Sequence, residues 1–130
     1  MAFLVGTDPA FPVIDNDRAL VNVGETVNNL GNTGTSATIN LNNGTFVTAT
    51  LTGNCTFTFS NPVPGASSFS LILKNDGTSS RSITWPPSVR WPSGVIPTRS
   101  TGANRVDVYT FVSVDGGTIW YGSLAQYNYA

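Results

Sequence analysis

Residues 37–59 read ATINLNNGTFVTATLTGNCTFTF, and the spacing of their apolar side chains decides the fold class. Apolar residues alternate with threonine and asparagine in three consecutive runs, which is the period of a half-buried β-strand. Asn43-Gly44 and Gly53-Asn54 separate the runs. Asn-Gly between two alternating runs is a strong signal for a β-hairpin, because both residues tolerate a positive φ. The stretch therefore predicts three strands joined by tight hairpin turns.

The same alternation recurs further along the chain. Residues 69–73 carry an apolar face, and residues 106–114 place valines on one face with Tyr109 and Phe111 on the other. Asp115-Gly116-Gly117 then turns the chain into a last strand. The 13 glycines and 8 prolines interrupt the sequence too often for long helices. We expect an all-β fold, an antiparallel β-sandwich or jelly-roll-like domain with an extended N-terminal arm.

Residues 1–35 are the least periodic part of the chain. Prolines keep the backbone there extended, and one strand is predicted around residues 19–23. The Gly-, Asn- and Thr-rich residues 31–36 have the composition of a flexible connector. We therefore expect an N-terminal arm and linker over residues 1–35 and a β-sandwich domain over residues 36–130. An arm with apolar side chains but no core of its own packs on its own domain or on a neighbouring subunit.

Charged residues make up only 10% of the 130 residues, and the formal net charge is −1. This gives no electrostatic basis for binding nucleic acid. A surface of hydroxyl and amide groups suits close packing against other subunits. Basic residues gather between positions 74 and 105 and acidic residues in the first 25, which is either chance at small numbers or an acidic arm that docks on a basic neighbour. No segment has the length and apolar character of a membrane span, so no membrane partner is expected.

The side chains that usually carry chemistry are scarce. The chain has no histidine and a single cysteine, Cys55, which we expect to be a small buried residue. Without histidine, the commonest general base and zinc ligand are missing. Asp76 and Asp115 fall in turns, where aspartate bonds the local backbone. We expect no catalytic, metal or cofactor site, and no enzyme activity.

Asp107 lies between valines in the middle of a predicted strand. A buried carboxylate there needs a partner, and the sequence offers Arg81 or Arg105 without deciding between them.

The aromatic residues leave two readings open. Trp85 and Trp120 lie on predicted strands, and we expect them to pack in the core. Trp91 begins an irregular, proline-rich loop and remains a candidate for contact outside the domain. In the alternative reading, Trp91 and Tyr121 stack on a sugar while Arg90 supplies hydrogen bonds.

Several short strings in the second half of the chain form a recognisable set. They are FSLILKNDG (69–77), ITWPPSVRW (83–91), NRVDV (104–108), DGG (115–117) and WYG (120–122). Together they resemble a module of tailed-bacteriophage virion proteins that ends tail-fibre-like proteins and also forms small capsid decoration proteins. The resemblance covers roughly residues 40–124.

This resemblance implies a β-sandwich virion protein, commonly trimeric. The short segment before the β-domain favours a homotrimeric capsid decoration (cement) protein, whose partners would be its own copies and the major capsid protein or another virion protein. The alternative is a tail-fibre or receptor-binding tip that recognises host carbohydrate. The residues expected to contact the capsid or another subunit are Phe3, Leu4, Val5, Phe11, Tyr109 and Phe111. The residues expected to contact carbohydrate in the alternative are Trp91, Tyr121 and Arg90.

Overall fold

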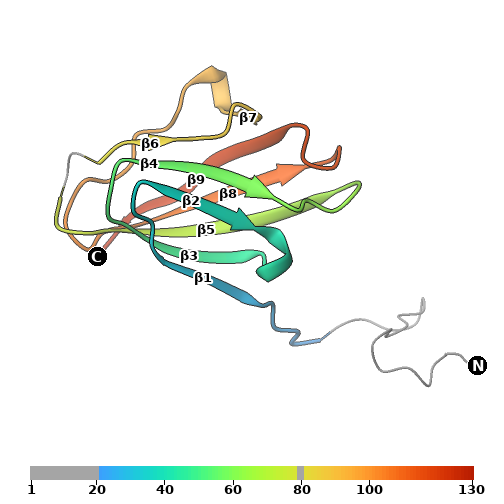
Figure 1. The fold of residues 1–130 in the computed structure, drawn as a ribbon, viewed down its shortest axis with the longest axis horizontal. Helices are drawn as coiled ribbons and strands as arrows, with labels where there is room; N and C mark the ends of the chain where they lie inside the picture. Colours follow the sequence, from blue (N-terminus) through green and yellow to red (C-terminus); the bar gives the residue numbers. More distant parts are fainter. Residues whose placement is uncertain (1–20, 79–80) are drawn as a thin grey trace, which may run out of the picture.

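The fold consists of two β-sheets that face each other (Figure 1). A computed structural model describes residues 21–78 and 81–130 of the protein. Within these residues the only helical pieces are two short 3-10 turns, Leu41–Asn43 and Pro92–Gly94. The predicted all-β class is therefore confirmed.

Nine strands make up the two sheets. They are β1 (Val27–Asn32), β2 (Ser36–Asn40), β3 (Phe46–Leu51), β4 (Cys55–Ser60), β5 (Ser67–Asn75), β6 (Ile83–Thr84), β7 (Val89–Arg90), β8 (Val106–Ser113) and β9 (Trp120–Tyr129). The larger sheet has the order β1-β3-β5-β8-β9-β7, and the smaller sheet has the order β2-β4-β6.

The first six strands alternate between the two sheets. β1 pairs with β3 and β3 with β5, while β2 pairs with β4 and β4 with β6, all in parallel. The chain thus winds as a coil in which each turn lays one strand on each sheet. The expected antiparallel sandwich is wrong for this half of the molecule.

Both predicted hairpins in residues 37–59 are wrong for the same reason. β2 and β3 flank Asn43-Gly44 but belong to different sheets, and β3 and β4 flank Gly53-Asn54 in the same way. The turn at residues 41–44 is a 3-10 turn that ends at Gly44 with a φ of 134°. Alternation places one face of each strand against the core in a hairpin and in a coil alike, so this period does not identify the strand's neighbour.

The last hairpin follows the sequence prediction. β8 and β9 pair antiparallel through the turn at residues 115–117, and β8 also pairs antiparallel with β5. The carboxylate of Asp115 accepts a hydrogen bond from the Ile119 N–H at 3.0 Å, as expected for an aspartate in a turn, and this bond lowers its pKa. β5 therefore joins the parallel coil on one side to the antiparallel hairpin on the other.

The ordered sheet begins earlier than the predicted domain boundary. β1 lies inside the segment expected to be arm and linker, and its Val27 pairs with Phe46 of β3. Of the strand predicted around residues 19–23, residues 21–23 are exposed and outside any strand, and the remaining two lie outside the described residues.

The core fills the space between the two sheets with aromatic rings. Phe69 and Phe111 stack with centroids 4.9 Å apart, and Phe59 and Trp120 meet this pair edge-on. Trp85, which follows β6, stacks on Phe57 at 5.3 Å. The core positions predicted for Trp85, Trp120 and Cys55 are confirmed, and burial raises the pKa of the Cys55 thiol.

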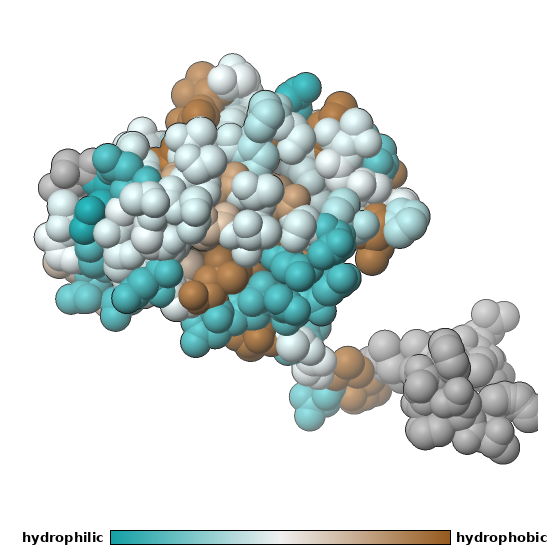
Figure 2. Space-filling view, viewed as in Figure 1, coloured by the Kyte–Doolittle hydropathy of each residue, from teal (hydrophilic) through white to brown (hydrophobic). Residues whose placement is uncertain are grey.

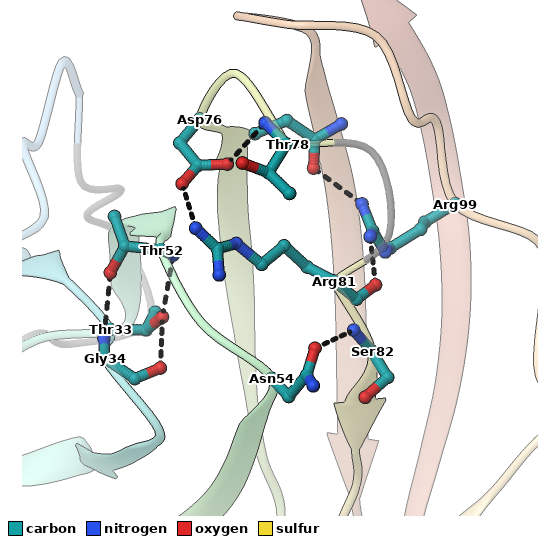
Figure 3. A network of polar contacts seen from close by, with 10 residues as sticks. Thr33, Gly34, Thr52, Asn54, Asp76, Thr78, Arg81, Ser82 and Arg99 are labelled. Carbon is teal, nitrogen blue, oxygen red and sulfur yellow. Dashed lines mark hydrogen bonds and ion pairs between the residues drawn. The ribbon is translucent and has the colours of Figure 1, made fainter.

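Polar contacts join the corners where successive turns of the coil cross between sheets (Figure 3). The Gly34 N–H donates to Thr52 Oγ1 at 3.0 Å, and the Ser82 N–H donates to Asn54 Oδ1 at 3.0 Å. In the third corner, Arg81 pairs with Asp76 at 2.8 Å and lowers the pKa of that carboxyl. Each corner is thereby held to its neighbour by short side chains as well as by the strand ladders.

Asp107 anchors the long crossover that leads from β7 to β8. It is 3% exposed, and its carboxylate accepts hydrogen bonds from the Ser100 N–H at 2.8 Å, the Ser100 hydroxyl at 2.5 Å and the Asn128 N–H at 2.9 Å. Neither arginine suggested by the sequence makes these bonds, and Arg81 pairs with Asp76 instead. The carboxylate therefore fastens the crossover and the end of β9 to β8.

The contact between the first two corners predicts a specific sensitivity at Gly53. A Cβ atom at this position would lie 2.7 Å from the Gly34 carbonyl oxygen, so the two corners would have to separate. We expect Gly53→Ala to lower the free energy of unfolding by about 1–3 kcal/mol, as overpacking does. Urea denaturation measures this loss.

Gly77 provides the matched control, because it lies in the third corner with open space around its Cβ position and no positive φ. Gly77→Ala should leave the urea midpoint nearly unchanged. Equal effects of the two substitutions would contradict the corner contact.

Candidate interaction surfaces

The outer face of the six-stranded sheet is broad and nearly without charge. Side chains lie in rows that cross the strands, such as Val27–Phe46–Ser70–Thr110 and Thr48–Ile72–Val108. Within the six strands of this sheet, Lys74 and Arg90 are the charged side chains that point outward. We name this surface the outer face.

Tyr109 and Phe111 do not belong to the outer face. They are 1% and 0% exposed and lie in the core between the sheets. Burial and the neighbouring Asp107 carboxylate raise the pKa of Tyr109. The expectation that these two residues contact another subunit is corrected, because the outward side of β8 carries Val106, Val108, Thr110 and Val112 instead.

The opposite side of the molecule, over the three-stranded sheet, is a hydroxyl surface. Its strands contain no charged residue, and their outward positions are filled almost entirely by serine and threonine. These outward residues are Ser36, Thr38, Asn40, Thr56, Thr58, Ser60 and Thr84. In Figure 2 the surface over β2 and β4 is correspondingly pale, neither strongly hydrophilic nor strongly hydrophobic. Both sheets thus present faces with very little charge.

Trp91 is a packing residue. Its ring centroid lies 5.4 Å from that of Trp85 and 5.8 Å from that of Phe111. A Cβ atom at Gly122 would lie 2.9 Å from the Trp91 ring, so the absence of a side chain on β9 makes room for the indole. The sequence left Trp91 open to outside contact, and the structure places much of it against the core.

Arg90 and Tyr121 are brought together, but away from Trp91. They are paired across β7 and β9, and both are exposed. Trp91 follows Arg90 directly and points to the other side of the strand, toward the core. The Arg90 guanidinium donates to the Pro87 carbonyl at 2.9 Å. The three residues of the expected sugar platform therefore do not share one surface.

An open hollow of about 470 Å³, with a lining of mixed polarity, lies beside Trp91, where the chain leaves the smaller sheet. Trp85, Pro86, Pro87, Trp91 and Ile96 line it together with a few neighbours. Among its lining side chains, Thr84, Trp85 and Trp91 carry hydrogen-bonding groups.

The apolar arm residues Phe3, Leu4, Val5 and Phe11 lie outside the described residues. Among residues 21–78 and 81–130, no group of three histidine, cysteine or acidic side chains is placed to hold a metal ion. No helix in the same ranges is long and apolar enough to span a membrane.

Comparisons with models of protein families, with curated proteins and with solved structures find no match for this chain.

Sequence reasoning missed one feature that the structure makes plain. In the second half of β9, residues 125–129 are all exposed, although a strand in a two-layer fold normally buries every second side chain. The sequence contained a signal for this, because Tyr127 and Tyr129 are the only large apolar side chains after Leu124.

The packing of Trp91 predicts a loss of stability on its removal. We expect Trp91→Ala to lower the free energy of unfolding by about 3 kcal/mol, because it opens a cavity beside Trp85 and Phe111. Tyr121→Ala is the matched aromatic control, since Tyr121 is 55% exposed, and it should cost about 0.5 kcal/mol or less. Urea denaturation of both variants measures the two losses of stability and allows them to be compared. A small effect of Trp91→Ala on the free energy of unfolding would mean that Trp91 is a surface residue and not a packing residue.

Proposed function

We propose that this chain is a non-enzymatic structural protein of a tailed-bacteriophage virion, a homotrimeric decoration protein on the capsid surface. The observation that carries the proposal is the pair of sheet faces with very little charge. Depletion of charged residues is typical of the buried centre of protein interfaces. The resemblance of the strings in residues 69–122 to phage virion proteins supports this class of particle.

In this proposal the outer face packs against another copy of the chain. Its exposed apolar side chains include Phe46 and Val112, at 40% and 45% exposed. One pair of outward hydroxyl groups, Thr110 and Ser123, is already hydrogen-bonded within the sheet at 2.8 Å. Burial of this pair therefore leaves no unpaired polar group there to oppose association.

The N-terminal arm then reaches the capsid shell with its apolar residues. Because β1 begins at Val27, these anchors can be removed without touching a described strand. A deletion that reached residue 30 would instead remove part of the larger sheet.

Location on the particle is the direct test of the proposal. Antibody labelling of virions that carry this chain, viewed by electron microscopy, should decorate the capsid. Labelling confined to the tail would overturn the capsid assignment, and absence from purified particles would overturn the virion role.

Deletion of residues 2–12 tests the arm. It removes Phe3, Leu4, Val5 and Phe11, and we expect capsid occupancy to fall while the far-UV circular dichroism of the β-domain stays unchanged. Unchanged occupancy of the folded variant would eliminate the arm as the capsid contact.

A second candidate function is host carbohydrate recognition at a tail tip. The observation in its favour is the exposed Arg90–Tyr121 pair, which combines a hydrogen-bond donor with an aromatic ring. On a glycan array, binding should be lost in Tyr121→Ala and Arg90→Ala and kept in Tyr127→Ala, an equally exposed tyrosine elsewhere on β9. Trp91→Ala is unsuitable here, because its packing role would confound binding with folding.

A further inference from the structure

β9 has a free edge along its second half. Trp120 and Tyr121 pair with β7, and β8 runs along the other side of β9. From Ser123 to Tyr129, no strand within residues 21–78 and 81–130 lies on the β7 side. The backbone groups of such an edge are a template for another strand.

This edge lacks the side chains that usually protect one, although its register with β8 shifts on both sides of Val108 and Asn128 has a φ of 66°. The sequence from Ser123 to Tyr129 is SLAQYNY, with no lysine, no proline and no charge. Lysine, proline and inward charges are the common means of preventing strand addition. Tyr127 and Tyr129 are 63% and 49% exposed, so the faces of the strand end are uncovered as well.

The chain also holds a strand-like sequence whose described part pairs with no strand. The sequence ALVNV at residues 19–23 has the composition of a strand, yet Val21 and Val23 are 83% and 58% exposed and unpaired. In Figure 1 the described residues before β1 lead away from the two sheets. The molecule therefore presents a free edge and a free strand sequence at the same time.

The segment cannot reach the β9 edge of its own chain. Hydrogen bonding of Glu25 to Thr45 at 2.7 Å fixes the chain beside β1, which is at one border of the larger sheet. β9 lies beyond β3, β5 and β8, roughly 19 Å across the sheet at about 4.8 Å between strands. Residues 24–26 span at most about 10 Å when fully extended. A strand formed by residues 19–23 could therefore reach this edge only in another molecule.

We infer that residues 19–23 of one copy add as a strand to the free edge of β9, Ser123–Tyr129, in a second copy. This inference rests on the self-association proposed above and adds a strand exchange to the outer-face contact between copies.

The side chains of the two segments are compatible. Val21 and Val23 share one face of an extended strand, and valine packs well against a tyrosine such as Tyr129 on a neighbouring strand. Charge is also complementary. Asp15 and Asp17 lie just upstream of the segment, while Lys74 and Arg105 lie beside Val106, the ladder partner of Tyr129.

The contact joins two different surfaces, so it is head-to-tail. An interface of this kind forms a closed ring when the rotation between copies closes, and otherwise forms an open filament. A homotrimer is one such ring.

Light scattering coupled to size exclusion tests the inference. Wild-type protein should elute as an oligomer, and the double variant Val21→Asp/Val23→Asp should elute at the 13.7 kDa of a single chain with unchanged circular dichroism. The control is Val95→Asp/Ile96→Asp, which alters two similarly exposed apolar residues elsewhere and should stay oligomeric. A monomeric wild type would overturn self-association itself. An oligomeric Val21→Asp/Val23→Asp variant would overturn only the strand addition.

Disulfide trapping tests the same contact without disturbing assembly. Cys55 is 2% exposed, so introduced cysteines dominate the thiol chemistry. A mixture of Val23→Cys protein and Tyr127→Cys protein should form a disulfide between the two kinds of chain under mild oxidation. The control is a mixture of Val23→Cys protein and Val63→Cys protein, because Val63 is exposed in a loop away from the proposed contact. Equal linkage of both mixtures, or none in either, would contradict the contact.

Discussion

Lateral pairing of strands that are distant in the sequence is the constraint on which the rest of the molecule depends. β1, β3 and β5 form one parallel ladder, β2 and β4 form another, and neither ladder contains two consecutive strands. Each crossing between sheets must therefore bring the chain back in register with a strand laid down a full turn earlier. The hydrogen bonds from Gly34 to Thr52 and from Ser82 to Asn54 stabilise that register at the corners, where the ladders themselves end. The aromatic core can close only after both ladders are aligned.

The sequence predicted strands and their buried faces far better than it predicted their partners. Alternation correctly placed Val47, Ala49 and Leu51 on one buried face, and it identified the core positions of Trp85 and Trp120. It could not distinguish a hairpin from a crossing to the other sheet, because Asn43-Gly44 permits a positive φ in either case. Among the described strands, β8 and β9 alone are both consecutive in the chain and neighbours in a sheet, and at their hairpin the local signal was sufficient.

Predictions about individual surface residues fared unevenly for a related reason. Alternate residues of a strand point to opposite faces, so the sequence shows which residues share a face. It does not show which face meets the core when both faces are apolar, as they are in β8. Tyr109 and Phe111 were therefore assigned to the wrong side. Trp91 lies in a loop whose sequence has no periodicity, so no pattern predicted its environment. Its packing role follows from its contact with the Trp85 ring and from its position over Gly122, which has no side chain. The partners of Asp107 were likewise beyond local reasoning, since Ser100 belongs to the crossover and Asn128 to the end of β9.

The position of β5 has a consequence for the order in which the chain folds. β5 is flanked by β3 on one side and by β8 on the other, so the coil made by the first half of the chain is bordered by a strand near its C-terminus. During synthesis, the early turns of the coil leave the ribosome with that side of β5 uncovered. Non-local and parallel pairings also form slowly, because the intervening chain must be ordered first. The nascent protein therefore completes its core only when the β8–β9 hairpin, itself a local and fast element, emerges and closes the sheet.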